Sequence, residues 1–540
     1  MALTRVYLKN AIGDIHNKHP EANTEVFVDD TCMQATCGTF DGVLDIIVPA
    51  VTMFGDEAKQ LKLGLSPKAV VTASSNKLAN VLKNELATYG MQFQTSQHAR
   101  DLGIAHTAGA TRPSKLLMKR FAKRTHKVKK VNEIDRITKH AKHLFTGSVF
   151  SSATWGHQAS SLSDSSIIQL ERDALACTGI RPGGRCRALA LVAAFGLQGT
   201  PRARIVRESI RAWFHLLNMC DSNMIGRLRS AWAKAYARVA NHNVEKHIHA
   251  ILNNIISILL KAGWNPKTMF CWNDDDGATW TMSGIRTSSD AVAAAVNKSS
   301  CKKELARAAH HYLGKGMANG IHYDATMAVL RNLKKEQYNI KCSLETVLSG
   351  ATWPAERISQ SYPDVSPICC RCGEEPEDAL HCYWTCKANH NIEDDEVQST
   401  QDLVDSAVAK CKEYPCLWLR GLLPAGFINI PPEADPVQTL DITYVNPEQA
   451  CFGSGTYYGD ASGGTHTRYP DIRRVGCAFA SIDHSGELIF AAHFPLPGDV
   501  QTVSRGELFA LIALVRRAEQ FTDIEFVTDN KGVIDKYNRF

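Results

Sequence analysis

The sequence predicts a multidomain protein of mixed α and β structure, and three observations lead to that expectation. The chain has 540 residues, enough for about three or four domains of ordinary size. Residues 130–350 carry apolar side chains at helical spacing, whereas residues 451–540 alternate strand-like segments with one amphipathic helix. A short segment rich in cysteine and histidine lies between them. We therefore expect an α+β N-terminal part, a mostly helical middle, a small metal-binding module and an α/β C-terminal domain.

Composition excludes several classes of protein. Hydrophobic residues make up 44% of the chain and charged residues 21%, which allows folded cores and argues against wholesale disorder. The net charge of +6 permits a polyanionic partner without requiring one. The 17 cysteines are odd in number and irregularly spaced, and the N-terminal "MALTRVYLKNAIGD" has no apolar signal-peptide core. We expect a reducing compartment, nucleus or cytoplasm, and no membrane partner, because the longest apolar run, "ALALVAAFGL", is too short to cross a bilayer.

The N-terminal part alternates helical and strand-like segments. The expected elements are a helix over 1–20, a hairpin around "VFVDDT" at 26–31, a helix over 41–63, a short strand in "GLSPKAVVTAS" at 64–74, a helix ending at Gly90, and a strand pair in "RDLGIAHTAG" at 100–109. Asp29 and Asp30 fall at the expected hairpin turn. Adjacent carboxylates at such a turn could bind a divalent cation if another strand supplied a further carboxylate.

A strongly basic segment follows, and it allows two interpretations. Its cations are Lys115, Lys119, Arg120, Lys123, Arg124, Lys127, Lys129 and Lys130. The first interpretation is a solvated helix face, and the second is a surface that follows the phosphates of a nucleic acid. Further along, we expect the acidic "NDDDG" at 273–277 to be a solvated loop, and Trp264, Trp272 and Trp280 to be core residues.

The segment "ICCRCGEEPEDALHCYWTC" at 368–386 has the spacing of a zinc site. Cys369 and Cys372 can chelate one ion from a turn, while His381 and Cys386 can approach it from a short helix. Three thiolates and one imidazole complete a closed tetrahedral site, which is the structural kind. Cys370 and Cys382 lie beside this set, so the ligand choice could shift by one residue, and a cysteine-rich loop without metal is the alternative. We expect Zn²⁺ here to stabilise a small module.

Three carboxylates of the C-terminal domain fall where secondary structure elements begin or end. "GTYYGDASGG" is strand-like and reaches Asp460, "QTVSRGELFALIALVRRAEQF" predicts a helix with Glu507 near its first turn, and "DIEFVTDN" predicts a buried strand that ends at Asp529. Such positions can converge at one edge of a sheet. Clustered carboxylates repel one another, so they need Mg²⁺ or Mn²⁺ between them. Two such ions can activate water and stabilise the leaving oxygen of a phosphodiester.

Residues 451–540 resemble a type 1 ribonuclease H domain, on the segments "YYGDASGG", "QTVSRGELFAL" and "FVTDN". The resemblance implies a metal triad of Asp460, Glu507 and Asp529, and cleavage of the RNA strand of RNA–DNA hybrids. It also implies contacts with the hybrid by Thr502, Ser504, Gly463 and Asn530, and recognition of RNA through its 2′-hydroxyl groups. In the family a fourth carboxylate and a mobile histidine lie on a later segment than "GVIDKYNRF", which ends this sequence.

The N-terminal part is similar to the palm of reverse transcriptases. "VFVDD" resembles their aromatic-x-Asp-Asp turn, "GLSPKAVVTAS" with Lys68 resembles the next palm motif, and "RDLGIAHTAG" resembles the strand pair that follows. The helical middle and the Cys-Cys-His-Cys module stand in the order found in non-LTR-type retroelement polymerases. The family places the partner carboxylate of Asp29 upstream of this hairpin, so we expect Asp29, Asp30 and Lys68 to be a remnant without polymerase activity.

These interpretations combine into one domain plan. It comprises a palm remnant at 1–112, a helical thumb and connection at 113–350, a zinc module at 351–395, a linker at 396–450 and a ribonuclease H-like domain at 451–540. The expected partners are an RNA–DNA hybrid and an RNA or DNA template, with Lys119, Lys123, Arg124 and Lys127 among the contacts. The alternative is a retroelement remnant that binds nucleic acid without chemistry. Nothing in the sequence predicts the oligomeric state.

Overall fold

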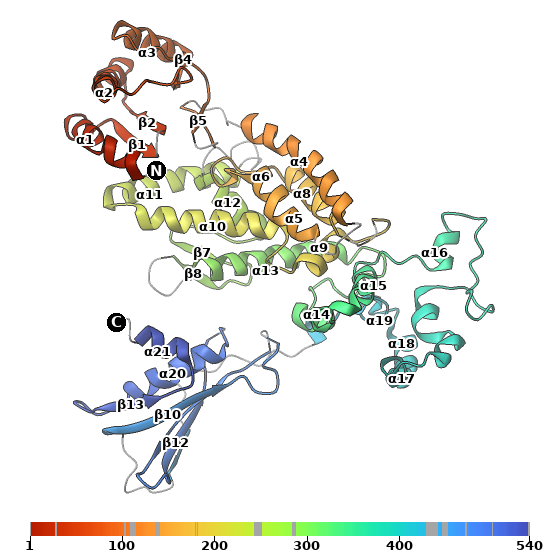
Figure 1. Cartoon of the computed structure of the whole chain (residues 1–540). Helices are drawn as coiled ribbons and strands as arrows, with labels where there is room; N and C mark the ends of the chain where they lie inside the picture. Colours follow the sequence, from red (N-terminus) through yellow and green to blue (C-terminus); the bar gives the residue numbers. More distant parts are fainter. Residues whose placement is uncertain are drawn as a thin grey trace. The chain divides into compact units, whose positions relative to one another are not determined.

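The computed structural model of the chain describes residues 2–27, 30–101, 104–108, 115–135, 141–178, 180, 182–241, 251–282, 288–427, 441–444, 452–469, 472–498 and 500–537. The fold is mixed α and β, as expected, with small sheets and many helices (Figure 1). Contacts divide the chain into two compact units, one of residues 1–308 with 345–352 and the other of residues 309–344 with 353–540. No helix among the described residues has both the length and the apolar character needed to cross a bilayer.

The N-terminal part of the first unit has the predicted order of helices and hairpins. Its elements are α1 (Ala2–Lys18), β1 (Asn23–Phe27), β2 (Asp30–Gln34), α2 (Phe40–Gln60), β3 (Val70–Val71), α3 (Asn76–Thr88), β4 (Gln94–Thr95), β5 (Ala99–Asp101) and β6 (Ile104–His106). Phe27 pairs with Asp30 in the antiparallel β1–β2 hairpin. The Ser75 Oγ accepts a hydrogen bond from the Leu78 amide at 3.2 Å and so begins α3. Gly90 follows α3 with a φ of 75°, the left-handed conformation expected at a helix C-terminus.

Helices dominate the rest of the first unit. They are α4 (Lys115–Asp135), α5 (Ala141–Leu144), the π-helix η1 (Phe145–Phe150), α6 (Ser151–Thr154), α7 (His157–Ser160), α8 (Asp164–Ala176), α9 (Arg187–Phe195), α10 (Pro201–Met219), α11 (Ser222–Asn241), α12 (Ile251–Ala262) and α13 (Ser289–Ala308). One apolar core lies under α4, η1, α8 and α9, and a second lies among α10, α11, α12 and α13. A small hairpin, β7 (Cys271–Asn273) and β8 (Thr279–Thr281), closes the second core.

Tryptophan side chains pack in the second core beside the acidic loop of this hairpin, and one of them donates a hydrogen bond to that loop. Trp264 and Trp272 are buried, as predicted, and Trp280 packs against the same core. The "NDDDG" loop is less solvated than expected, because the Trp280 Nε1 donates to the Asp274 Oδ2 at 3.0 Å and the Ser299 hydroxyl donates to Asp275. Its carboxylates therefore bind neighbouring side chains and backbone amides of the protein.

The second unit begins with short helices around the cysteine-rich segment. They are α14 (Tyr323–Asn332), η3 (Lys335–Gln337), α15 (Tyr338–Leu348, within which the division between the units falls), α16 (Ala355–Ser359), the π-helix η4 (His381–Thr385), η5 (Lys387–Asn391), α17 (Asp395–Ser399), η6 (Gln401–Leu403), α18 (Val404–Lys410), α19 (Pro415–Trp418) and η7 (Ala425–Phe427). The range 396–450, which was expected to be a linker, thus contains several short helical turns.

A five-stranded sheet forms the C-terminal part. Its strands are β9 (Asp441–Tyr444), β10 (Gly455–Ser462), β11 (Gly476–Ile482), β12 (Leu488–Pro495) and β13 (Ile524–Val527), in the order β13-β10-β11-β12-β9. Only β10 and β13 are parallel neighbours in this sheet. Helix α20 (Val503–Val515) packs on β10 and β11, and α21 (Lys531–Tyr537) follows β13 (Figure 1). Strand β9 lies within the expected linker, so the sheet begins before residue 451.

Candidate metal centres

The structure brings the three carboxylates of the C-terminal domain together. Asp460 lies on β10, Glu507 on the first half of α20 and Asp529 just after β13, and one oxygen of each lies within 4.8 Å of the others. The parallel register explains the meeting of the two aspartates. Tyr458 pairs with Val527, and each aspartate stands two residues further on, at the same edge of the sheet.

Close packing of α20 on the sheet brings Glu507 to the same place. A side chain at Gly506 would meet a methyl group of Val475 at 2.6 Å and the Cβ of Ala461 at 2.7 Å, so only glycine permits this approach. Thr502 caps the helix, because its Oγ1 accepts a hydrogen bond from the Arg505 amide at 3.3 Å. The Glu507 carboxylate is consequently buried beside Asp460, with only 5% of the residue exposed.

One threonine orients the buried glutamate. The Thr528 hydroxyl donates to the Glu507 Oε2 at 2.8 Å and accepts from the Asn530 amide at 3.1 Å. Glu507 therefore has a fixed carboxylate orientation, which a metal ligand requires. Thr528 was not among the residues predicted from the sequence, although its position directly before Asp529 is the signal that could have identified it.

The donor set fits a hard divalent cation. Three carboxylates lie close together, and Mg²⁺ prefers such oxygen ligands. Asp460 and Asp529 are exposed, so a bound ion would keep positions open for water and for a phosphate oxygen. The Asp460 Oδ1 accepts a hydrogen bond from the Ala461 amide at 2.7 Å, which fixes one of its oxygens. This arrangement can support metal-assisted hydrolysis.

The residues expected to contact a hybrid lie around the triad, and three of them have structural roles. Thr502 caps α20, and the Asn530 Oδ1 accepts from the Gly532 amide at 2.9 Å at the start of α21. A side chain at Gly463 would collide with Thr467. Ser504 is exposed on the first turn of α20. Their contact with nucleic acid stays a prediction.

A buried glutamine holds the loop before α20. The Gln501 Nε2 donates to the carbonyl oxygens of Leu496 at 2.8 Å and Gly498 at 2.6 Å, while its Oε1 accepts from the Val475 amide at 2.8 Å. All three side-chain bonds join segments next to the triad. This role could not be predicted from the sequence, because a glutamine before a helix is ordinarily a surface residue.

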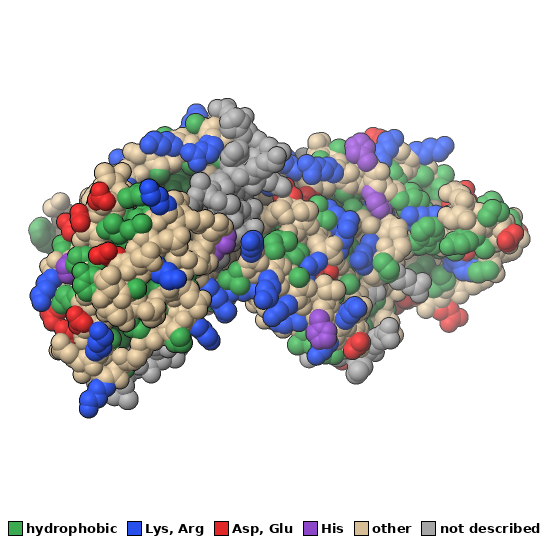
Figure 2. Space-filling view, turned by 90° about the horizontal axis from the view of Figure 1, so that it is seen from above, with side chains coloured by type: hydrophobic (Ala, Val, Ile, Leu, Met, Phe, Trp, Pro, Cys, Tyr) green, Lys and Arg blue, Asp and Glu red, His purple; other side chains and the backbone are tan. Residues whose placement is uncertain are grey.

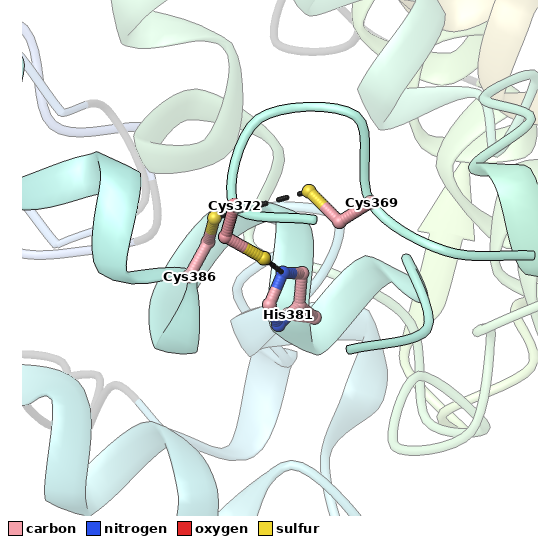
Figure 3. A group of neighbouring side chains, drawn as sticks. All are labelled: Cys369, Cys372, His381 and Cys386. Atoms are coloured by element: carbon pink, nitrogen blue, oxygen red, sulfur yellow. Dashed lines mark hydrogen bonds between the residues drawn. The ribbon is translucent and has the colours of Figure 1, made fainter. Parts of the chain in front are cut away.

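The four predicted zinc ligands also converge (Figure 3). Their ligand atoms lie within 4.8 Å of one another, with 3.9 Å between the Cys369 and Cys386 sulfurs and 3.4 Å between the Cys372 sulfur and the His381 Nε2. A tetrahedral Zn²⁺ with ordinary bond lengths separates two sulfurs by about 3.8 Å. The geometry therefore fits zinc. Cys370 is exposed, and neither Cys370 nor Cys382 belongs to the group, which consists of Cys369, Cys372, His381 and Cys386.

Backbone amides favour the thiolate form of two of these cysteines. The Cys372 amide lowers the pKa of the Cys369 thiol, and the amides of Glu374 and Glu375 lower the pKa of Cys372. Burial raises the pKa of Cys386. The Glu375 carboxylate lies 3.1 Å from the His381 Nδ1, which leaves Nε2 facing the thiols. Carboxylates in this position orient histidine ligands of zinc.

The palm-like residues do not form a metal centre among the described residues. Asp29 lies outside the described residues, Asp30 is exposed at the start of β2, and Lys68 is exposed. The acidic groups that could hold a metal in the described part of the chain do not include Asp30.

The basic helix α4 divides into an outer face and an inner face. Lys119 and Lys123 are exposed, as a phosphate-binding surface requires. Arg124 instead forms an ion pair of 2.6 Å with Asp173, with only 12% of each side chain exposed, and its contact with nucleic acid stays a prediction. The Lys127 Nζ donates to the Ser152 Oγ at 2.9 Å. On the face shown in Figure 2, Lys and Arg side chains are spread among other residues and form no single band.

No protein-family model, curated protein or solved structure matches the chain.

Proposed function

We propose that the C-terminal domain hydrolyses the RNA strand of RNA–DNA hybrids, as a ribonuclease H-type domain within a protein derived from a retroelement reverse transcriptase. The observation that carries the proposal is the meeting of Asp460, Glu507 and Asp529 at one edge of a sheet. The strand order supports it as well, because the parallel register of β10 and β13 brings Asp460 and Asp529 to the same edge of the sheet.

The chain's own residues hold the reacting groups in place. Asp460, Glu507 and Asp529 would hold Mg²⁺ or Mn²⁺, and Thr528 fixes Glu507. Bound divalent cations supply an activated water and charge stabilisation at the leaving oxygen. Water adds to the phosphorus, the bond from phosphorus to the 3′-oxygen breaks, and that oxygen takes a proton. The products are a 5′-phosphate and a 3′-hydroxyl.

The first test is cleavage of a labelled RNA–DNA hybrid in Mg²⁺ and in Mn²⁺. The Asp460→Asn variant should lose more activity than the about 10- to 100-fold typical of residues that only orient a ligand. The Asp535→Asn variant is the matched control, because Asp535 is an exposed carboxylate on α21 of the same domain. Equal cleavage by Asp460→Asn and the parent would refute the assignment.

The zinc module would serve folding. Cys369, Cys372, His381 and Cys386 fill all four positions of a tetrahedral ion, so a bound Zn²⁺ would have no open position for a substrate. Its expected contribution is to hold together a segment of the second unit that has short helices and few buried side chains.

A second candidate function is nucleic-acid binding without chemistry. It is favoured by the exposed Lys119 and Lys123 on α4. These lysines belong to the first unit, whereas the triad belongs to the second. Binding of this kind should weaken steeply with salt and show little sequence preference. Retained, salt-sensitive binding with no cleavage in either metal would favour this candidate over hydrolysis.

A further inference from the structure

A polar cavity in the first unit is separate from both candidate metal centres. It has a volume of about 890 Å³, and its wall includes Arg100 of β5, Arg120 and Lys127 of α4, Asp30 of β2, and Trp155. The π-helix η1 and the start of α6 complete the wall with glycine and serine residues. A π-helix is rare and frequently accompanies a functional site.

The charges of the wall favour an anion. Three cations face one carboxylate, Asp30, so the charged side chains of the lining sum to +2. Arg100 and Arg120 line the same cavity, and burial, followed by repulsion from the charge of Arg100, lowers the pKa of Arg120. A phosphate between them would relieve that repulsion, because each guanidinium can donate two parallel hydrogen bonds to it.

Two of the cations are fixed in the wall by hydrogen bonds. Arg120 donates from Nη1 to the carbonyl oxygen of Trp155 at 3.2 Å, and Lys127 donates to the Ser152 Oγ at 2.9 Å. A guanidinium has five N–H donors and an ammonium three, so each can bind a phosphate in addition to these contacts. Arg120 and Lys127 are therefore held in position before a ligand arrives, which reduces the entropy lost on binding.

Trp155 adds an aromatic surface at the same cavity. The residue is 56% exposed, unlike the buried tryptophans of the second core. Its backbone is fixed on both sides, by Arg120 at its carbonyl and by the left-handed Gly156, which has a φ of 80°. An exposed indole beside phosphate-binding cations is the combination that holds unpaired bases, since every base has a face that can stack.

We propose that this cavity binds one unpaired nucleotide of a single-stranded nucleic acid, with the phosphate on Arg100, Arg120 and Lys127 and the base stacked on Trp155. A base that is paired and stacked inside a duplex cannot reach the indole. The site therefore prefers single strands, and it works without metal and without the carboxylate triad. This inference goes beyond the proposed hydrolysis and does not depend on it.

The test is binding of a fluorescent thymidine 12-mer to the full chain, followed by anisotropy at low salt in EDTA. A DNA strand without metal is no substrate for the proposed nuclease, so cleavage does not enter the result. Trp155→Ala should weaken binding of the single strand about tenfold or more and leave binding of the matching DNA duplex unchanged. Trp155→Phe should restore most of the affinity, because phenylalanine also stacks.

Two charge variants test the proposed binding of the phosphate, and they should change the affinity in opposite directions. Arg100→Gln should weaken binding and make the dependence on salt shallower by about one counterion. Asp30→Asn should tighten binding several-fold, because it removes the carboxylate that opposes the phosphate, and a misfolded variant could not bind more tightly. Arg227→Gln, an exposed arginine on α11, is the control and should change nothing. The proposal is overturned if Trp155→Ala binds the single strand as the parent does, or if Asp30→Asn weakens binding.

Discussion

The hydrogen bond between Thr528 and Glu507 illustrates how single residues shape the candidate nuclease site. Glu507 is the buried member of the triad, and the hydroxyl of Thr528 is 2.8 Å from its Oε2. A carboxylate whose orientation is fixed binds a cation without losing rotational freedom at that moment. Thr528 is thus a positioning residue, and it touches neither a substrate nor a metal in this account.

Replacing Thr528 by valine should reduce cleavage of the hybrid about 10- to 100-fold, since the shape is kept and the hydrogen bond is lost. The loss should shrink at high Mg²⁺, because a poorly oriented Glu507 mainly weakens metal binding. Activity measured against Mg²⁺ concentration checks this. Thr528→Ser keeps the hydroxyl and is the control. A loss in Thr528→Val that is the same at every Mg²⁺ concentration would argue against a positioning role.

At the scale of the element, the cysteine-rich segment has little apolar core of its own. The buried residues there include three of the proposed ligands, Cys369, His381 and Cys386. Binding of zinc to this segment would therefore supply much of its folding energy. The pKa values of Cys369 and Cys372 are lowered, which favours their thiolate forms and would extend to lower pH the range over which a bound Zn²⁺ is retained.

Removal of zinc should unfold this segment selectively. A chelator, or the Cys372→Ser variant, should make the region around 365–391 sensitive to protease while the triad domain keeps its fold. Limited proteolysis with mass spectrometry would locate the cuts. Cys370→Ser is the matched control because Cys370 is exposed and outside the cluster. Identical proteolysis of Cys372→Ser and Cys370→Ser would contradict the ligand assignment.

His157 of α7 is buried against α10. Its Nδ1 lies 2.9 Å from the carbonyl oxygen of Thr154, and burial lowers its pKa from the ordinary value of 6.5, although Glu208 opposes that shift. A histidine with a lowered pKa binds its proton more readily in the unfolded chain. Stability of the first unit should therefore fall as the pH drops below 6.5, towards the lowered pKa.

Thermal unfolding between about pH 8 and about pH 5 measures this dependence. The His157→Gln variant should show a shallower loss of stability on acidification than the parent. His215→Gln, an exposed histidine on α10, should keep the parent's slope. An unchanged slope in His157→Gln would mean that other groups cause the acid sensitivity.

At the scale of the whole molecule, the order of elements was accessible from the sequence, because it depends on local periodicity. The β1–β2 hairpin, the helix ending before Gly90 and the spaced carboxylates of the C-terminal domain lie as predicted. Asp460 and Asp529 could be expected to meet because strand ends in one sheet fall at a shared edge. The Cys-His spacing likewise limits which ligands can reach one ion.

Features built from distant residues were not accessible in this way. The cavity joins Asp30, Arg100 and Arg120, which lie on three elements far apart in the sequence. Strand β9 has four residues, too few to show a period, and it was assigned to a linker. The ion pair between Arg124 of α4 and Asp173 of α8 joins two separate helices, which the sequence alone could not reveal. Tertiary contacts decide all three cases.

Hydrolysis of RNA within a hybrid differs from other phosphodiester cleavage in the duplex that is cut and in the ends that are left. RNA–DNA, RNA–RNA and DNA–DNA duplexes of the same sequence are incubated in Mg²⁺ with the parent chain and with Glu507→Gln, and the ends of the products are identified. The parent should cut only the RNA strand of the hybrid and leave 5′-phosphate and 3′-hydroxyl ends, and Glu507→Gln should cut none of the three duplexes. Cleavage of RNA–RNA as well, cyclic phosphate ends, or full activity in Glu507→Gln would contradict this prediction.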